Sequence, residues 1–230
     1  HLFTSAPAVQ ASVPVMELSL LILLTLIGAA AVLTVYLPLR WLAGQARGSG
    51  NWRDAVFFGG TGLGYLAIEI ALMQKFGLFL GHPNYALSVV LAALLLASGL
   101  GALLSTRIVS ALGGLRFVAY ALAGVLLAEH LLALPALPGL VAWSLAARVA
   151  VAFGLVAPLG LLLGTFVPTA IEALKADRPG FVPWAWGING IFSVLAPVLS
   201  IAFSMTFGIG ALLLASIPIY LAVGLVHRPA

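Results

Sequence analysis

The chain contains no cysteine and very little charge. The absence of cysteine excludes disulfides, thiolate metal sites and cysteine nucleophiles. Only 7% of the 230 residues are charged, whereas a soluble domain carries about 25%. Hydrophobic residues make up 63%, too many for a soluble chain to cover its surface with polar groups. The composition therefore predicts an integral membrane protein, whose lipid-facing surface should be apolar.

The apolar residues fall into seven runs, most of them near the ~20 residues that a helical membrane crossing needs. The runs cover residues 15–39, 55–79, 85–105, 117–134, 141–167, 183–207 and 211–226. We therefore expect an all-α, polytopic transmembrane bundle of about seven helices. Residues 1–14 are expected to form an extramembrane N-terminal segment. Because the chain starts with His1 and lacks a basic signal-peptide start, we expect a processed chain or a fragment of a longer protein.

The basic residues predict an orientation. With seven crossings, one side of the membrane would hold eight of the ten Lys and Arg residues, namely Arg40, Arg47, Arg53, Arg107, Arg116, Lys175, Arg178 and Arg228. Basic loops favour the cytoplasm, so the N-terminus is predicted outside and the C-terminus inside. The net charge of +4 is then a topology signal, and we expect no nucleic-acid partner.

Two charged residues are predicted at membrane depth. Counted from the expected helix ends, Glu69 and Arg148 both lie about 10–12 Å below the outer surface. Matching depth and opposite charge predict an ion pair, which would either fix helix packing or line a proton or solute pathway. In the remaining alternative, Arg148 extends towards the interface and the two side chains never meet.

A second polar group is expected nearer the outer surface, formed by Lys75, His82, Glu129 and His130, with Gln74 beside it. Lys75 and Glu129 are placed to pair at the interface. The two histidines have no HxxxH or HxH spacing, so we expect no metal site. No Ser-His-Asp or paired-carboxylate pattern is apparent, and no catalytic residue is expected. The glycines at 59–64 lack the strand and acidic residue of a dinucleotide site, so no cofactor is expected.

Other residues indicate membrane anchoring and helix packing. Trp41, Trp184 and Trp186 fall near the expected cytoplasmic interface, where tryptophan anchors helices. Asn189 lies between two glycines, a pattern that predicts close helix approach and an interhelical hydrogen bond. Small residues four apart also predict packing seams; they are Gly60 with Gly64, Ala97 with Gly101, and Gly160 with Gly164.

Two motifs carry a resemblance to a known family. GYLAIEIALMQKFGLFLGHP (64–83), continuing to SGLG (98–101), is one motif, and VPWAWGINGIFSV (182–194) is the other. Over residues 55–226 the chain resembles the C-terminal membrane half of bacterial fused transporter-like and spermidine-synthase-like integral membrane proteins. The resemblance implies the bacterial inner membrane and identifies motif positions, namely Glu69, Gln74, His82, Pro83, Trp184, Trp186, Asn189 and Gly190.

The resemblance implies no reaction for this chain, because the Rossmann-type, aminopropyltransferase-like domain of that family is absent from it. We therefore expect a non-catalytic integral membrane domain or subunit that anchors or assembles with a partner in a larger complex. Expected partners are the lipid bilayer and other membrane subunits or a soluble domain. The alternative is a transporter-like domain that moves a small solute, for which a cation is a candidate, with Glu69 and Glu129 in its path.

Overall fold

The computed structural model describes residues 6–37, 40 and 51–227, and all regular secondary structure within them is helical. The α-helices are α1 (Ala6–Ala31), α3 (Trp52–Leu80), α4 (Pro83–Leu103), α5 (Ser105–Leu112), α6 (Leu115–Ala128), α7 (Leu134–Ala136), α8 (Leu145–Asp177), α9 (Val182–Phe207) and α10 (Ile209–Val226). Short π segments cover Val32–Tyr36 and Glu129–Ala133, and short 3-10 segments cover Leu137–Leu140 and Pro179–Phe181.

Six helical segments in the described part are long and apolar enough to cross a membrane, which indicates an integral membrane protein. They are Trp52–Leu80, Pro83–Leu103, Leu115–Leu140, Leu145–Asp177, Pro179–Phe207 and Ile209–Val226. The expected first crossing, residues 15–39, coincides with α1 and the π segment after it, but the apolar stretch described there is only Leu21–Ala31. This helix begins at Ala6, earlier than the sequence pattern suggested.

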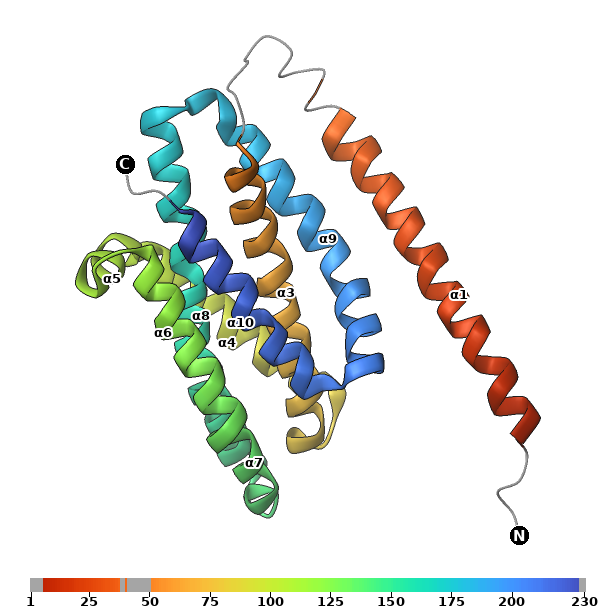
Figure 1. Cartoon of the computed structure of the whole chain (residues 1–230). Helices are drawn as coiled ribbons and strands as arrows, with labels where there is room; N and C mark the ends of the chain where they lie inside the picture. Colours follow the sequence, from red (N-terminus) through yellow and green to blue (C-terminus); the bar gives the residue numbers. More distant parts are fainter. Residues whose placement is uncertain (1–5, 38–39, 41–50, 228–230) are drawn as a thin grey trace.

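The helix α3 lies at the centre of the bundle (Figure 1) and contacts α4, α8, α9 and α10. Of its most apolar stretch, 61% is buried inside the protein, whereas the value for the α9 segment is 22%. Ile68, Ala71, Leu72 and Phe76 are fully buried on it. Figure 1 shows α1 standing to one side of the bundle, where it contacts α9.

Two of the predicted small-residue seams bring helices into close contact in α3 and α8. A Cβ atom added at Gly60 would lie 2.7 Å from Val223, and one added at Gly64 would lie 2.7 Å from the Tyr220 ring, so this seam seats α10. A Cβ added at Gly160 would lie 2.8 Å from the Ala97 Cβ. The prediction of packing seams is thus confirmed for both helices.

The facing half of the α4–α8 seam is closer still. Added Cβ atoms at Gly101 and Gly164 would meet the backbones of Leu161 and Ser98. No larger residue fits at either position unless α4 and α8 move apart, so the predicted Ala97–Gly101 seam is confirmed as well.

The helix α8 differs from the expected run at residues 141–167. It begins later, because Ser144 accepts a hydrogen bond from the Ala147 backbone N–H (3.4 Å) and so caps the helix N-terminus. It also continues through Pro168 to Asp177. Proline removes one backbone donor, which helices packed in a bundle tolerate. The polar stretch after Pro168 is therefore the last part of a long helix.

The short helix α5 was not expected as a separate element. It follows α4 directly and ends at Gly113, whose φ of +87° favours glycine. At the other end of the bundle, Gly208 alone connects α9 to α10, with a φ of +89°. The tight α9–α10 hairpin expected from Gly208 and Gly210 is confirmed.

Candidate functional site

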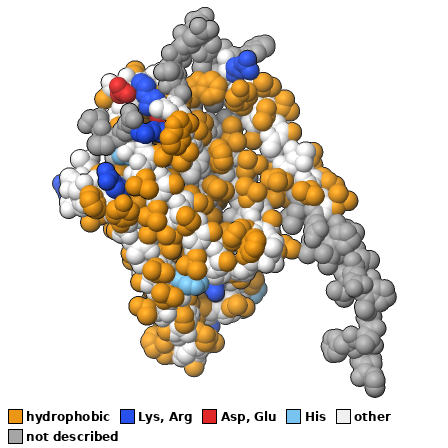
Figure 2. All heavy atoms as spheres, viewed as in Figure 1, with side chains coloured by type: hydrophobic (Ala, Val, Ile, Leu, Met, Phe, Trp, Pro, Cys, Tyr) orange, Lys and Arg blue, Asp and Glu red, His pale blue; other side chains and the backbone are white. Residues whose placement is uncertain are grey.

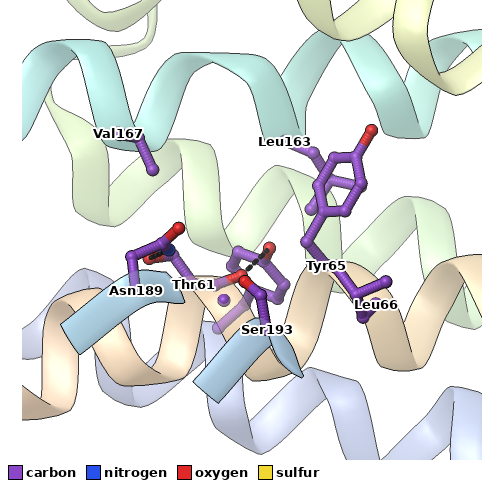
Figure 3. A pocket seen from close by; sticks show the side chains of 9 residues that line it. Thr61, Tyr65, Leu66, Leu163, Val167, Asn189 and Ser193 are labelled. Atoms are coloured by element: carbon purple, nitrogen blue, oxygen red, sulfur yellow. Dashed lines mark hydrogen bonds between the residues drawn. The ribbon is translucent and has the colours of Figure 1, made fainter. Parts of the chain in front are cut away.

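A small cavity of about 140 Å³, lined by both apolar and polar side chains, lies between α3, α8, α9 and α10 (Figure 3). Its lining residues come from four helices that the glycine seams bring together; they are Thr61, Gly62, Tyr65, Leu66, Leu163, Val167, Asn189, Ser193 and Tyr220. Figure 3 shows Asn189, Thr61 and Ser193 on one side of the cavity and Tyr65 with Leu66 on the other. The cavity is the candidate functional site.

Asn189 ties α9 to α3 on one wall of the cavity. Its Nδ2 donates to the Phe58 carbonyl (3.1 Å) and to Thr61 Oγ1 (3.1 Å). Thr61 Oγ1 in turn donates to the Phe58 carbonyl (3.0 Å). The interhelical hydrogen bond predicted for Asn189 is confirmed.

The close approach beside Asn189 depends on Gly62 of the partner helix. A Cβ added at Gly62 would lie 2.5 Å from the Asn189 carbonyl oxygen and 2.8 Å from Ser193 Oγ. A Cβ added at Gly190 would meet nothing within 4 Å, so the expectation that this flanking glycine permits the approach was wrong. The small residue that the contact requires is on α3.

Two tyrosines bound the rest of the cavity. The Tyr220 hydroxyl donates to the Thr61 carbonyl (3.4 Å), and its ring packs against Phe166 at 5.0 Å between centroids. The Tyr65 hydroxyl lies 3.5 Å from Ser98 Oγ of α4. The cavity therefore offers hydroxyl and amide groups as hydrogen-bond donors and acceptors, and none of its lining residues is charged.

Glu69 lies one helical turn after Tyr65, which places both side chains on the same face of α3. Glu69 is buried, with 8% of its surface exposed, and forms no ion pair with any described residue. The predicted Glu69–Arg148 pair is absent. Arg148 Nη1 instead donates to the Phe79 carbonyl (2.9 Å), one of the last carbonyls of α3.

The position of each helix end explains this error. Because α8 starts at Leu145, Arg148 lies only about one turn inside it. Glu69 is eleven residues before the α3 end at Leu80, roughly 16 Å deeper along the helix. The two side chains therefore do not share a depth.

The members of the second predicted polar group form no ion pair with one another. Lys75 and Glu129 form no ion pair, and the side chains of Gln74 and Lys75 form no hydrogen bond within the described chain. Glu129 is buried in the π segment, and its Oε2 has no hydrogen-bond partner there. His130 lies against α10, where a Cβ added at Gly210 would be 3.0 Å from its ring.

His82 has a local structural role. Its Nδ1 accepts a hydrogen bond from the Asn84 backbone N–H (3.2 Å), and Pro83 occupies the first turn of α4. Together they start this helix after the turn at Gly81. Among the described residues, no group of three His, Asp or Glu side chains lies close enough to hold a metal ion.

The tryptophans lie near the start of α9. Trp184 is half-buried, and its ring contacts Tyr36 edge-on at 6.1 Å, while Trp186 is 56% exposed. Anchoring at a membrane interface stays a prediction for both. Trp41 lies outside the described residues.

A salt bridge that the sequence pattern does not predict joins Asp54 to Arg178. Arg178 Nη1 and Nη2 donate to the two Asp54 carboxylate oxygens at 2.8 and 3.0 Å, and these hydrogen bonds raise the pKa of the guanidinium. Asp54 also accepts from the Asn51 backbone N–H, which completes a capping box at the start of α3. The Asn-x-x-Asp spacing is a recognisable signal for that cap, but it does not identify Arg178 as the partner.

His227 lies directly after the last of the six long apolar segments. The His227 ring follows α10 and packs 5.5 Å from the Phe57 ring, and burial lowers the pKa of the His227 imidazole.

Comparisons of the chain with protein-family models, with curated protein sequences and with solved structures give no match.

Proposed function

We propose that this chain is a non-catalytic integral membrane domain or subunit of a spermidine-synthase-like membrane protein, which anchors or assembles with a partner in a larger complex. One observation carries the proposal: several of the motif residues on which the family resemblance rests are engaged in helix packing and capping. The Asn189 amide donates a hydrogen bond to α3, Gly64 leaves room for the Tyr220 ring, and His82 and Pro83 begin α4. These contacts build a scaffold.

The dimensions of the cavity also support a scaffold over a transporter. Sites for small molecules usually enclose about 300–1,000 Å³. The cavity of about 140 Å³ has room for on the order of four water molecules. The transporter-like alternative has one specific observation in its favour, the buried Glu69 without an ionic partner among the described residues.

We further propose seven crossings, with α1 as the first, in the bacterial inner membrane, the N-terminus outside and the C-terminus in the cytoplasm. The start of α3, the end of α8 and the end of α10 lie at the same end of the bundle (Figure 1), and Arg53, Lys175 and Arg178 belong to these segments. Lys75 and Arg148 belong to the opposite half. This asymmetry supports the orientation through the preference of basic residues for the cytoplasm.

The proposal is tested by the state of the protein in its own membrane. We expect the tagged chain, solubilised in a mild detergent, to run as a stable complex with a partner that carries an aminopropyltransferase-like α/β domain. Cross-linking followed by mass spectrometry should place that partner against this chain. A lone monomer that is stabilised by spermidine, and that takes up spermidine after reconstitution into liposomes, would overturn the proposal.

The variant Glu69→Gln distinguishes a scaffold from a transporter. In a scaffold, a neutral amide at this buried position should leave assembly intact, because Glu69 forms no ion pair within the described chain. In a transporter, the same change should abolish uptake. Thr206→Ser, a change near the C-terminal end of α9, serves as a control that should alter neither assembly nor uptake.

A further inference from the structure

The helix α5 connects two membrane-crossing segments without crossing itself. Its eight residues span about 12 Å, far less than the ~30 Å of a bilayer core. Ile108 and Val109 pack against the core, while Thr106, Arg107 and Ser110 are exposed. The helix therefore lies with one apolar side on the protein and a polar side outwards, at the end of the bundle that holds the start of α3.

Arg107 and Arg116 flank the turn between α5 and α6, and both side chains are exposed. Neither forms an ion pair with a described carboxylate. The described carboxylates at this end already have partners, because Asp54 and Asp177 bind Arg178 and Glu172 binds Lys175. Two positive charges are thus left uncompensated by the described part of the chain. Figure 2 shows basic side chains gathered at this end of the molecule.

The surroundings of these arginines are apolar. Leu103 at the end of α4 is 83% exposed, and Phe117 and Tyr120 on α6 are 49% and 45% exposed, with their rings in edge-on contact. Exposed aromatic and aliphatic side chains next to arginine suit the boundary between acyl chains and headgroups. A soluble acidic protein would match the charges but would leave these apolar side chains in water.

We propose that α5 and the start of α6 form a binding surface for anionic phospholipid, with Arg107 and Arg116 on the headgroup phosphates and Leu103, Phe117 and Tyr120 against the acyl chains. This surface goes beyond the proposed scaffold function, since it names a lipid class and does not depend on the protein partner. Charge complementarity identifies the occupant, because each exposed arginine near a membrane attracts anionic lipid.

Native mass spectrometry of the detergent-solubilised full chain tests the proposal, with added phosphatidylglycerol or phosphatidylcholine of the same acyl chains. We expect tighter binding of phosphatidylglycerol. Arg107→Gln and Arg116→Gln should each weaken it about fivefold, and the double variant about 25-fold. Replacement of both arginines by lysine should retain binding within about twofold. Lys75→Gln, the matched loss of one charge at the opposite end, should have no effect.

Three results would overturn the proposal. The first is unchanged phosphatidylglycerol binding in the double glutamine variant, and the second is an equal loss in Lys75→Gln. The third is equal competition by inorganic phosphate, which would indicate a small-anion site in place of a lipid surface. If the glutamine variants fail to fold, the unaltered chain still tests the proposal. Its preference for phosphatidylglycerol should vanish as salt rises from 0.1 M to 1 M, because the Debye length falls from about 10 Å to about 3 Å. A preference that persists at 1 M salt counts against the proposal.

Discussion

Replacing Gly62 by alanine should force α3 and α9 apart. The new Cβ would lie 2.5 Å from the Asn189 carbonyl oxygen, and ordinary contact begins near 3.4 Å, so the backbones must separate by about 0.9 Å. The hydrogen bonds from Asn189 Nδ2, now 3.1 Å long, would then stretch to about 4 Å and break.

The cost follows from three effects. Overpacking a close contact costs about 1–3 kcal/mol, and each interhelical hydrogen bond in a membrane contributes about 0.6 kcal/mol. Better helix propensity returns about 1 kcal/mol. We expect Gly62→Ala to lower the free energy of unfolding by about 1–3 kcal/mol, measured in mixed micelles of dodecylmaltoside with increasing dodecyl sulfate.

Gly77→Ala is the matched control on the same helix. A Cβ at Gly77 meets nothing within 4 Å, so this variant should be neutral or stabilised by up to about 1 kcal/mol. Asn189→Ala should cost about 1 kcal/mol, and the double variant with Gly62→Ala should cost less than the sum, because the same hydrogen bonds are lost in both. Equal stability of the Gly62 and Gly77 variants would refute the reasoning.

Two further predictions concern the ends of the helices. Asp54→Asn should lower the free energy of unfolding by about 1–2 kcal/mol, because it breaks a bidentate charged contact with Arg178 that is largely shielded from solvent. Glu172→Gln, at an exposed pair, should lower it by less than about 0.5 kcal/mol. Equal losses in the same micelle assay would contradict this. Since burial lowers the pKa of His227, the unfolded state binds its proton more readily, so stability should fall as the pH drops below about 6.5, and His227→Gln should flatten that part of the profile of melting temperature against pH. A slope that survives in the variant would assign the pH dependence to another group.

The sequence was sufficient to predict the all-helical fold class, the small-residue packing seams and the interhelical hydrogen bond of Asn189. Long apolar runs that are bounded on one side by His-Pro or glycine predict α4, α9 and α10 closely, because these residues act locally. The interhelical hydrogen bond of Asn189 could also be predicted, since a lone amide in an apolar helix needs a partner.

The errors involve information that is not local. The depth of Arg148 depends on where α8 begins, and the cap at Ser144 moves that start past the first apolar residue. The Asp54–Arg178 salt bridge joins residues far apart in the chain, and no spacing rule connects them. The helix α5 stayed hidden because its polar start, Ser105 to Arg107, ends the apolar run of α4, and the residues after it are too few to form an apolar run of their own.

The central place of α3 has a consequence for biosynthesis. The segment precedes several of its partners in the chain by more than 100 residues: Thr61 bonds to Asn189 and Tyr220, and Asp54 bonds to Arg178. Until the α9–α10 hairpin is made, the glycine-rich surface of α3 and its polar groups face lipid or an insertion factor. The hairpin thus closes the bundle as a late step, and chains cut before Val182 should be retained by the insertion machinery and degraded.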